Sequence, residues 1–208
     1  MVKNSYQRIA CSACITVFLM ACGSLTKAKE MDVIPEQEIT NHSDSPTLFP
    51  KIKGIGGVFR VDKAPKIAVN EAQKLVLNIT AFDPRERIHE GLEQAARALN
   101  LYALAGVPDE KVSIALVIHG KATSITLSDE TYSRKFNTPN PNSDILHLLK
   151  DNGVSILVCG QALHHHGFSP DDVNTSVKVT LSAMTALVEL QHEGYALVPD
   201  LTPEISRW

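Results

Sequence analysis

A short apolar segment bracketed by glycines constrains the fold more than any other part of the sequence. Residues 154–158 read Val-Ser-Ile-Leu-Val, with Gly153 before them and Cys159-Gly160 after them. A run of this length, rich in aliphatic side chains, is typical of a strand buried on both faces of a parallel sheet. Cys159 then ends that strand, at the edge of an open α/β sheet where ligands and reactive groups gather. The segment predicts an α/β fold with a thiol at that edge.

Strands and helices alternate along the rest of the chain. Further strands are predicted over residues 74–82, 111–118, 177–179 and 195–198, and helices over 83–105, 128–136, 144–152 and 181–192. This alternation implies right-handed crossovers between parallel strands. We therefore expect a three-layer α/β/α sandwich with a mainly parallel sheet of about five strands.

Two of these helices carry specific expectations. Asp83, followed by Pro84 and Glu86, has the pattern of an N-cap with a capping box. The last helix is expected to bury the aliphatic side chains that follow the helical period: Leu181, Met184, Leu187, Val188 and Leu190.

The first residues are expected to lie outside the fold. Lys3 and Arg8 form a basic segment, and an uncharged apolar run over residues 9–21 closes with Leu-Met-Ala before Cys22. This pattern is typical of an export signal, and it resembles the lipobox of bacterial lipoproteins. We expect residues 1–21 to be a lipoprotein signal peptide and Cys22 to carry a lipid anchor to the membrane. A plain signal peptide or an uncleaved anchor is the alternative.

Two regions follow this signal. Residues 22–50 are polar and are expected to form a flexible tether. Residues 51–208 then form the α/β domain, and its first part contains Gly-Ile-Gly-Gly at 54–57, which lacks the spacing of a dinucleotide-binding loop and is expected to pack on the domain. A lipid anchor places the protein in the bacterial cell envelope. Because Gly23 follows Cys22, we expect the periplasmic face of the outer membrane.

Cysteine usage and charge limit the classes of function that the sequence supports. Cys11 and Cys14 leave with the signal and Cys22 is acylated, so Cys159 remains as the single free thiol. The chain has a net charge of −3, and we expect no nucleic-acid partner. Beyond the signal, no paired carboxylates, GxSxG, P-loop or CxxC motif supports hydrolase, nucleotide or dithiol chemistry.

Three motifs resemble those of the DsrE/DsrF-like (YchN-like) family, over residues 74–199: Val117-Ile118-His119-Gly120, Leu157-Val158-Cys159-Gly160-Gln161 and Gly194-Tyr195. The resemblance implies a three-layer α/β/α fold and a homo-oligomer, a trimer or a hexamer. It also implies sulfur carried as a persulfide at the position of Cys159. The best-known sulfur-relay members are cytoplasmic, so an exported chain shares that function only in part.

Cys159 is the candidate reactive residue. A helix is predicted to begin at Gly160 or Gln161, and its unpaired N–H groups favour a negatively charged sulfur. We hypothesise a sulfurtransferase or a sulfur carrier that exchanges sulfur with a donor or acceptor molecule or protein. Alternatively, Cys159 is a buried apolar residue, and the same strand-end pocket belongs to a non-enzymatic oligomeric module that binds a small ligand or partner.

His119 is the candidate assisting residue. In the strand order that the family implies, its strand neighbours that of Cys159, so the imidazole is expected to activate the thiol or hold the thiolate. In the flavodoxin order another strand separates the two. A histidine that only fixes a loop is the alternative.

Other polar residues near this edge carry weaker expectations. Gly160, Gln161 and Asn140 are candidates for substrate binding at the pocket rim, or for local backbone capping. Residues 164–166 are three histidines, but neighbouring helical side chains point about 100° apart and do not converge on one ion. A mixed site of one of them with Cys159 and His119 is the alternative. We expect no metal and no cofactor.

Overall fold

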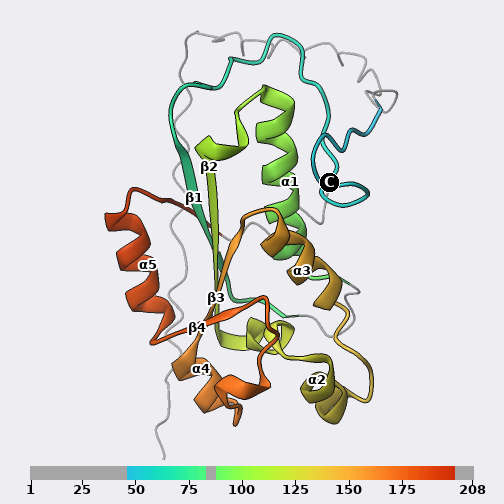
Figure 1. The fold of residues 1–208 in the computed structure, drawn as a ribbon, viewed down its shortest axis with the longest axis vertical. Coiled ribbons are helices and arrows are strands. Elements are labelled where there is room, and N and C mark those ends of the chain that lie inside the picture. The colour runs from blue at the N-terminus through green and yellow to red at the C-terminus, as the bar shows by residue number, and fades with distance from the viewer. Residues whose placement is uncertain (1–45, 83–87, 200–208) are drawn as a thin grey trace, which may run out of the picture. The chain divides into compact units, whose positions relative to one another are not determined.

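The computed structural model describes residues 46–82 and 88–199, which form an α/β fold with helices on both faces of one sheet (Figure 1). The strands are β1 (Gln73–Ile79), β2 (Val112–Ile118), β3 (Ser155–Cys159), β4 (Lys178–Thr180) and β5 (Ala196–Val198). The helices are α1 (Glu90–Ala105), α2 (Asp129–Phe136), α3 (Ser143–Asp151), α4 (Gly160–His165) and α5 (Ala183–His192). Within these described ranges, no helix is long and apolar enough to cross a membrane.

The described strands form one parallel sheet in the order β4-β3-β2-β1-β5. Its longest ladder joins β1 to β2, from the Gln73–Val112 pair to the Ile79–Ile118 pair. The predicted fold class is confirmed. Because β2 and β3 are direct neighbours, the flavodoxin order, with a strand between them, is excluded.

Alternating side chains along the strands build one core on each face of the sheet, as the pleat of a strand requires. On β2, Leu116 and Ile118 belong to the core that α1 and α3 cover, whereas Ala115 and Val117 belong to the core that α5 covers. Figure 1 shows α5 on one side of the strands and α1 and α3 on the other. The second core is built from small or short side chains: Val76, Ala115, Val117, Cys159, Ala183 and Ala186.

The buried face of α5 is not the predicted one. Ala183 and Ala186 are buried, whereas Leu181 is 72% and Met184 77% exposed, and Val188 is also exposed. The two predicted residues Leu187 and Leu190 are partly buried against the same core. The prediction was wrong for the larger exposed residues because periodicity identifies an apolar stripe and not the surface that the stripe meets. Small side chains let α5 approach the sheet closely and leave the larger ones facing outward.

The start of α1 also differs from the prediction. The predicted cap at Asp83 lies outside the described residues, and the helix begins at Glu90 with His89 as its N-cap. The buried His89 ring accepts a hydrogen bond from the Gly91 N–H through Nδ1, while Nε2 lies 2.7 Å from the Ala81 carbonyl oxygen. The predicted end is confirmed, since Gly106 takes the left-handed conformation just after the helix.

Candidate functional site

The carboxyl ends of β2 and β3 bring the two main candidate residues to neighbouring positions. Ile118 of β2 pairs with Val158 of β3, and His119 and Cys159 each come one residue later. Strand alternation directs both toward the α5 side of the sheet. Among the described residues no hydrogen bond joins His119 to Cys159 directly. The site is therefore a pair of adjacent strand ends, not a preformed ion pair.

Cys159 is both the last residue of β3 and the N-cap of α4. Its sulfur accepts a hydrogen bond from the Ala162 N–H, with an Sγ–N distance of 3.4 Å. Cys159 is only 6% exposed and packs in the same cluster as Val117 and Ala183. The amide contact places an N–H donor against the sulfur, and the packing restricts the approach of a reaction partner.

The two residues after Cys159 differ in what they contribute. A side chain on Gly160 would bring its Cβ within 2.8 Å of the Thr180 carbonyl oxygen, so only glycine lets α4 begin this close to β4. Gln161 is exposed, and its side-chain amide donates a long contact of 3.4 Å to the Leu181 carbonyl. Gly160 therefore fixes the position of the cysteine, and Gln161 lies at the surface beside it.

His119 is held from β1 through Asn78. The distance between His119 Nε2 and Asn78 Oδ1 is 2.8 Å. Since a carbonyl-type oxygen only accepts, Nε2 carries the proton in this contact and Nδ1 remains the basic nitrogen. Burial lowers the pKa of His119 from its ordinary value of 6.5. The imidazole is therefore neutral at pH 7 and is a base, not a fixed positive charge.

The remaining candidate residues serve the backbone. Asn140 is buried, and its amide donates to the carbonyl oxygens of Ile125 and Leu127 while its oxygen accepts from the Asn142 N–H. These bonds match the local capping alternative and not the pocket rim. His166 lies 2.8 Å from the Gly120 carbonyl oxygen through Nε2, which ties the end of α4 to the turn after β2.

Two of the three consecutive histidines, His164 and His165, are exposed. Within the part of the chain that the structure describes, no group of three or more His, Cys, Asp or Glu side chains is placed to hold a metal ion. The mixed site with Cys159 and His119 is therefore not formed by the described residues.

Asn78 is a site residue that the sequence analysis did not identify. The signal was present, since Asn78 is the single polar residue in the run Leu-Val-Leu-Asn-Ile at 75–79. A polar side chain in a buried strand needs a hydrogen-bond partner. The partner is His119 on the next strand, which becomes evident only once the β1–β2 register is known.

The comparisons with known proteins identify the family of this chain. The model of the DsrE/DsrF-like family matches residues 73–199, so the chain belongs to the DsrE/DsrF-like family. This family is associated with sulfur relay. No curated protein matches the chain.

Six chains of solved structures match this chain, among them the following two. One is MTH1491, a protein of unknown function from Methanobacterium thermoautotrophicum, with 23% identity and a TM-score of 0.47 over 62% of this chain and 99% of that one. The other is the ychN protein from E. coli, with 15% identity and a TM-score of 0.46 over the same shares of the two chains.

The lowered pKa of His119 predicts a pH-dependent stability. Between the lowered pKa and 6.5 the unfolded chain binds more protons than the folded chain at this residue, so the free energy of unfolding falls as pH falls through that window. In urea unfolding between about pH 7.5 and about pH 5, the unchanged protein should therefore lose stability relative to His119→Gln. The exposed His164→Gln is the control and should follow the unchanged protein. Equal pH slopes for all three chains would contradict the assignment.

Proposed function

We propose that this protein handles sulfane sulfur and that Cys159 accepts it as a persulfide. The observation that carries the proposal is the position of the Cys159 sulfur, which ends β3, accepts the Ala162 N–H and adjoins the strand that leads into His119. Membership of the DsrE/DsrF-like family supports the same chemistry.

The transfer step balances without an added oxidant. The Cys159 thiolate attacks the terminal sulfur of a donor persulfide, R–S–SH. The S–S bond of the donor breaks, a bond forms between Sγ and the transferred sulfur, and the donor leaves as the thiolate R–S⁻. Attack by an acceptor thiolate on the Cys159 persulfide passes the sulfur on. Catalytic turnover and stoichiometric carriage use the same step.

The neighbouring groups have separate roles in this step. The neutral His119, with Nε2 engaged by Asn78, retains Nδ1 to take up the thiol proton. The Ala162 N–H stabilises the charge that remains on sulfur. Gly160 and the exposed Gln161 border the approach to the sulfur and are the substrate-binding residues of the proposal. Asn140 is no longer part of it, because both ends of its amide are engaged by backbone or neighbouring groups.

Access to Cys159 depends on the segment that joins β4 to α5. Thr180 pairs with Cys159, Gln161 contacts the Leu181 carbonyl, and Ala183 packs in the same cluster as the thiol. Because Cys159 is buried by these neighbours, a donor reaches the sulfur only when this segment moves. The segment has few large buried side chains, which keeps the cost of local opening low.

A sulfane-sulfur donor tests the proposal directly. Incubating the purified chain with polysulfide should add about 32 Da, the mass of one sulfur, and dithiothreitol should remove it. The increment should be absent when Cys159→Ser is added to a chain that already lacks the thiols of Cys11, Cys14 and Cys22. A chain carrying Cys11→Ser, Cys14→Ser and Cys22→Ser is the matched control and should keep it.

Two results would contradict the sulfur proposal: no adduct with either polysulfide or thiosulfate, or an adduct that persists when Cys159→Ser is combined with the three other substitutions. They would favour the second candidate, a non-enzymatic module that binds a small ligand or partner. The burial of Cys159 among Val117, Ala183 and Ala186 is the observation that favours this candidate.

We also propose that the outer face of α5 is where copies of this chain assemble, as a trimer or a hexamer. Exposed apolar side chains lie on this helix, just before it and on the same face of the sheet: Leu181, Met184, Val188 and Leu197. Exposed apolar clusters of this kind are typical of protein interfaces. Leu181 directly follows the strand residue that pairs with Cys159, so an assembled neighbour would also border the thiol.

Introducing negative charges at Leu181, just before α5, and at Met184 on α5 tests this assembly. Burying Leu181 and Met184 at an interface contributes about 2 kcal/mol per side chain, so Leu181→Glu with Met184→Glu should convert the assembly to single chains. Light scattering measures the mass against the 22.7 kDa of one chain. Leu101→Glu places the same charge at an exposed leucine on α1 and should leave the assembly intact. Identical masses for the two variants would contradict the proposed interface.

The proposed setting is the cell envelope. The Leu-Met-Ala-Cys sequence that ends at Cys22 supports a lipid anchor there, with the chain at the periplasmic face of the outer membrane. The sequence predicts a tether that ends at residue 50, but Leu48 already pairs with Val58 inside the folded domain, so the proposed tether is residues 22–45. In this setting the sulfur donor and acceptor are exported molecules or envelope proteins.

A further inference from the structure

A second group of exposed apolar side chains lies away from α5. Phe59 is 51% and Val61 73% exposed, and Ile67 and Leu101 are exposed as well. The first three belong to the segment before β1, and Leu101 lies one turn before Leu104 on α1. Single exposed apolar residues are common. Here, however, Phe59 and Val61 lie on either side of Arg60 in the sequence, so exposed apolar and cationic residues alternate.

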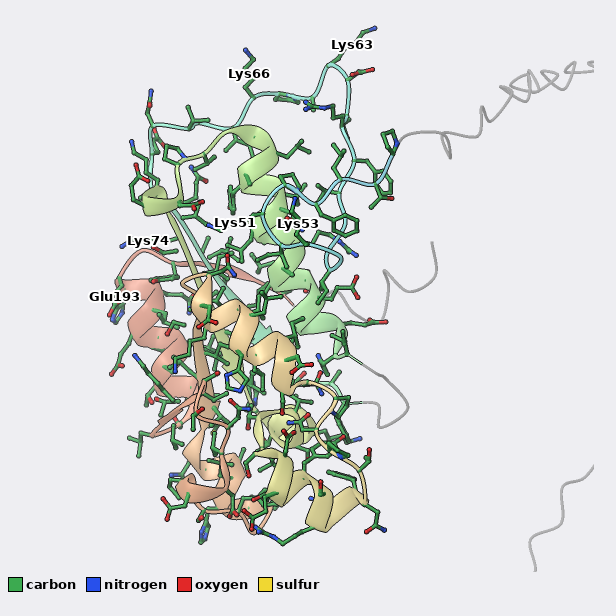
Figure 2. All side chains as sticks on the ribbon, turned by 45° about the vertical axis from the view of Figure 1, so that its right-hand side comes forward. Lys51, Lys53, Lys63, Lys66, Lys74 and Glu193 are labelled. Carbon is green, nitrogen blue, oxygen red and sulfur yellow. The ribbon has the colours of Figure 1, made fainter. Side chains whose placement is uncertain are left out.

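The same segment is strongly basic within an acidic chain. Residues 46–67 contain five cations, Lys51, Lys53, Arg60, Lys63 and Lys66, and a single acid, Asp62, whereas the whole chain carries −3. Lys51 is paired with Asp109 at 2.6 Å. Among the described residues, neither Lys53 nor Arg60 has an ion-pair partner. Figure 2 shows Lys63 and Lys66 at one end of the domain and Lys53 nearer its middle, beside Lys51.

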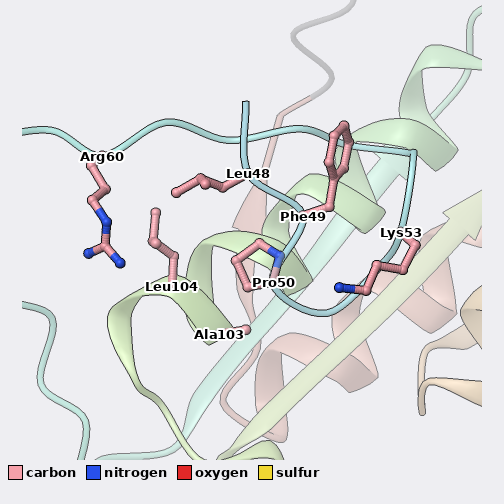
Figure 3. Close-up of a pocket in the computed structure, with 7 residues that line it drawn as sticks. All are labelled: Leu48, Phe49, Pro50, Lys53, Arg60, Ala103 and Leu104. Carbon is pink, nitrogen blue, oxygen red and sulfur yellow. The ribbon is translucent and has the colours of Figure 1, made fainter. Parts of the chain in front are cut away.

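Lys53 and Arg60 border an open pocket of about 400 Å³. The other lining residues are apolar: Leu48, Phe49, Pro50, Ala103 and Leu104. Figure 3 shows the two cationic side chains on opposite sides of these apolar residues. A pocket with an apolar lining and cations at its margins fits a ligand that has a hydrocarbon part and an anionic group.

The backbone around this pocket is held firmly by α1. The buried Asn100 side chain accepts from the Lys51 and Ile52 N–H groups and donates to the carbonyl oxygens of Ile52, Ile55 and Gly56. At Gly56 an added Cβ would lie 2.3 Å from the Arg97 nitrogen, so the segment runs directly against the helix backbone. Residues 51–56, which include Lys53, are therefore fixed against the helix.

We propose that Lys53, Phe59, Arg60, Val61, Lys63 and Leu101, here called the lead-in surface, bind the surface of a membrane that contains anionic phospholipids. The cations meet the headgroup phosphates, and the exposed apolar side chains enter the boundary with the acyl chains. A nucleic acid or an acidic protein would satisfy the cations alone and would leave Phe59 and Val61 in water. A surface that carries both anionic groups and hydrocarbon contacts the cations and the exposed apolar side chains together.

This docking orients the domain. The lead-in surface lies near the amino ends of the strands, since Lys51 pairs with Asp109 just before β2 begins, whereas His119 and Cys159 lie at the carboxyl ends. Figure 1 shows α1's last turns and α4 at opposite ends of the strands. A membrane bound at the lead-in surface therefore leaves the Cys159 edge facing away from it. The proposal does not depend on sulfur chemistry.

Vesicle flotation tests the lead-in surface. The expected mature chain, residues 22–208 with Cys22→Ser to prevent acylation, is mixed with phosphatidylcholine vesicles with and without phosphatidylglycerol. Each basic residue near an anionic surface contributes about fivefold in binding, so Lys53→Gln with Arg60→Gln should weaken binding to phosphatidylglycerol vesicles about twenty-fivefold. Phe59→Ser should also weaken it. The matched control, Lys121→Gln with Lys178→Gln, removes two exposed cations at the other end of the strands and should bind unchanged.

Three outcomes would overturn the proposal. The first is equal loss of binding in the test and control pairs, which reports net charge only. The second is equal binding to vesicles with and without phosphatidylglycerol. The third is full competition by glycerol 3-phosphate at matched ionic strength, which would make the pocket a site for a soluble anion. Thermal unfolding of each variant checks that the fold is retained, as expected for substitutions at the exposed Lys53, Phe59, Arg60, Lys121 and Lys178.

Discussion

The register between β2 and β3 is the constraint on which the candidate site depends. Because Ile118 pairs with Val158, the residues that follow, His119 and Cys159, leave the sheet side by side. A shift of one residue in that ladder would turn one of the two side chains to the opposite face. The register is specified by burial, since Leu116, Ile118, Ile156 and Val158 all belong to the core under α1 and α3.

A second constraint is the small volume of the side chains between the sheet and α5. Ala115, Ala183 and Ala186 allow the helix to lie close to the strands, and the same closeness covers Cys159. The thiol is thus shielded by a thin layer that lacks the large interlocking side chains of the opposite core. For the proposed persulfide, shielding would limit exchange with other thiols, and a thin cover would allow local opening.

Much of this arrangement is predictable from the sequence, because parallel strands and their ends are marked by continuous apolar runs. The run before Cys159 and the run before His119 give the strands, and the position of Cys159 as a helix cap follows from Gly160. The structure differs from the prediction where one sequence pattern is compatible with two arrangements. On α5 two stripes have helical spacing, and the alanine stripe faces the sheet because it packs more closely.

Contacts between segments distant in sequence explain the other differences. Asn78 becomes a site residue only through its bond to His119, and Asn140 loses its candidate role because its amide joins three backbone groups. Asn100 fixes residues 51–56 to α1 across almost fifty positions. The sequence around each of these asparagines does not indicate which residue its side chain will hydrogen-bond.

The central claim is that the Cys159 thiol becomes accessible by local opening and not by global unfolding. The most direct measurement is its alkylation by iodoacetamide in native buffer, followed by peptide mass analysis, at increasing low concentrations of urea. Local opening predicts a rate that is nearly independent of urea and is far faster than global unfolding allows. A rate that rises in parallel with the global unfolding equilibrium would show that the thiol is sealed in the folded protein, and would contradict the account.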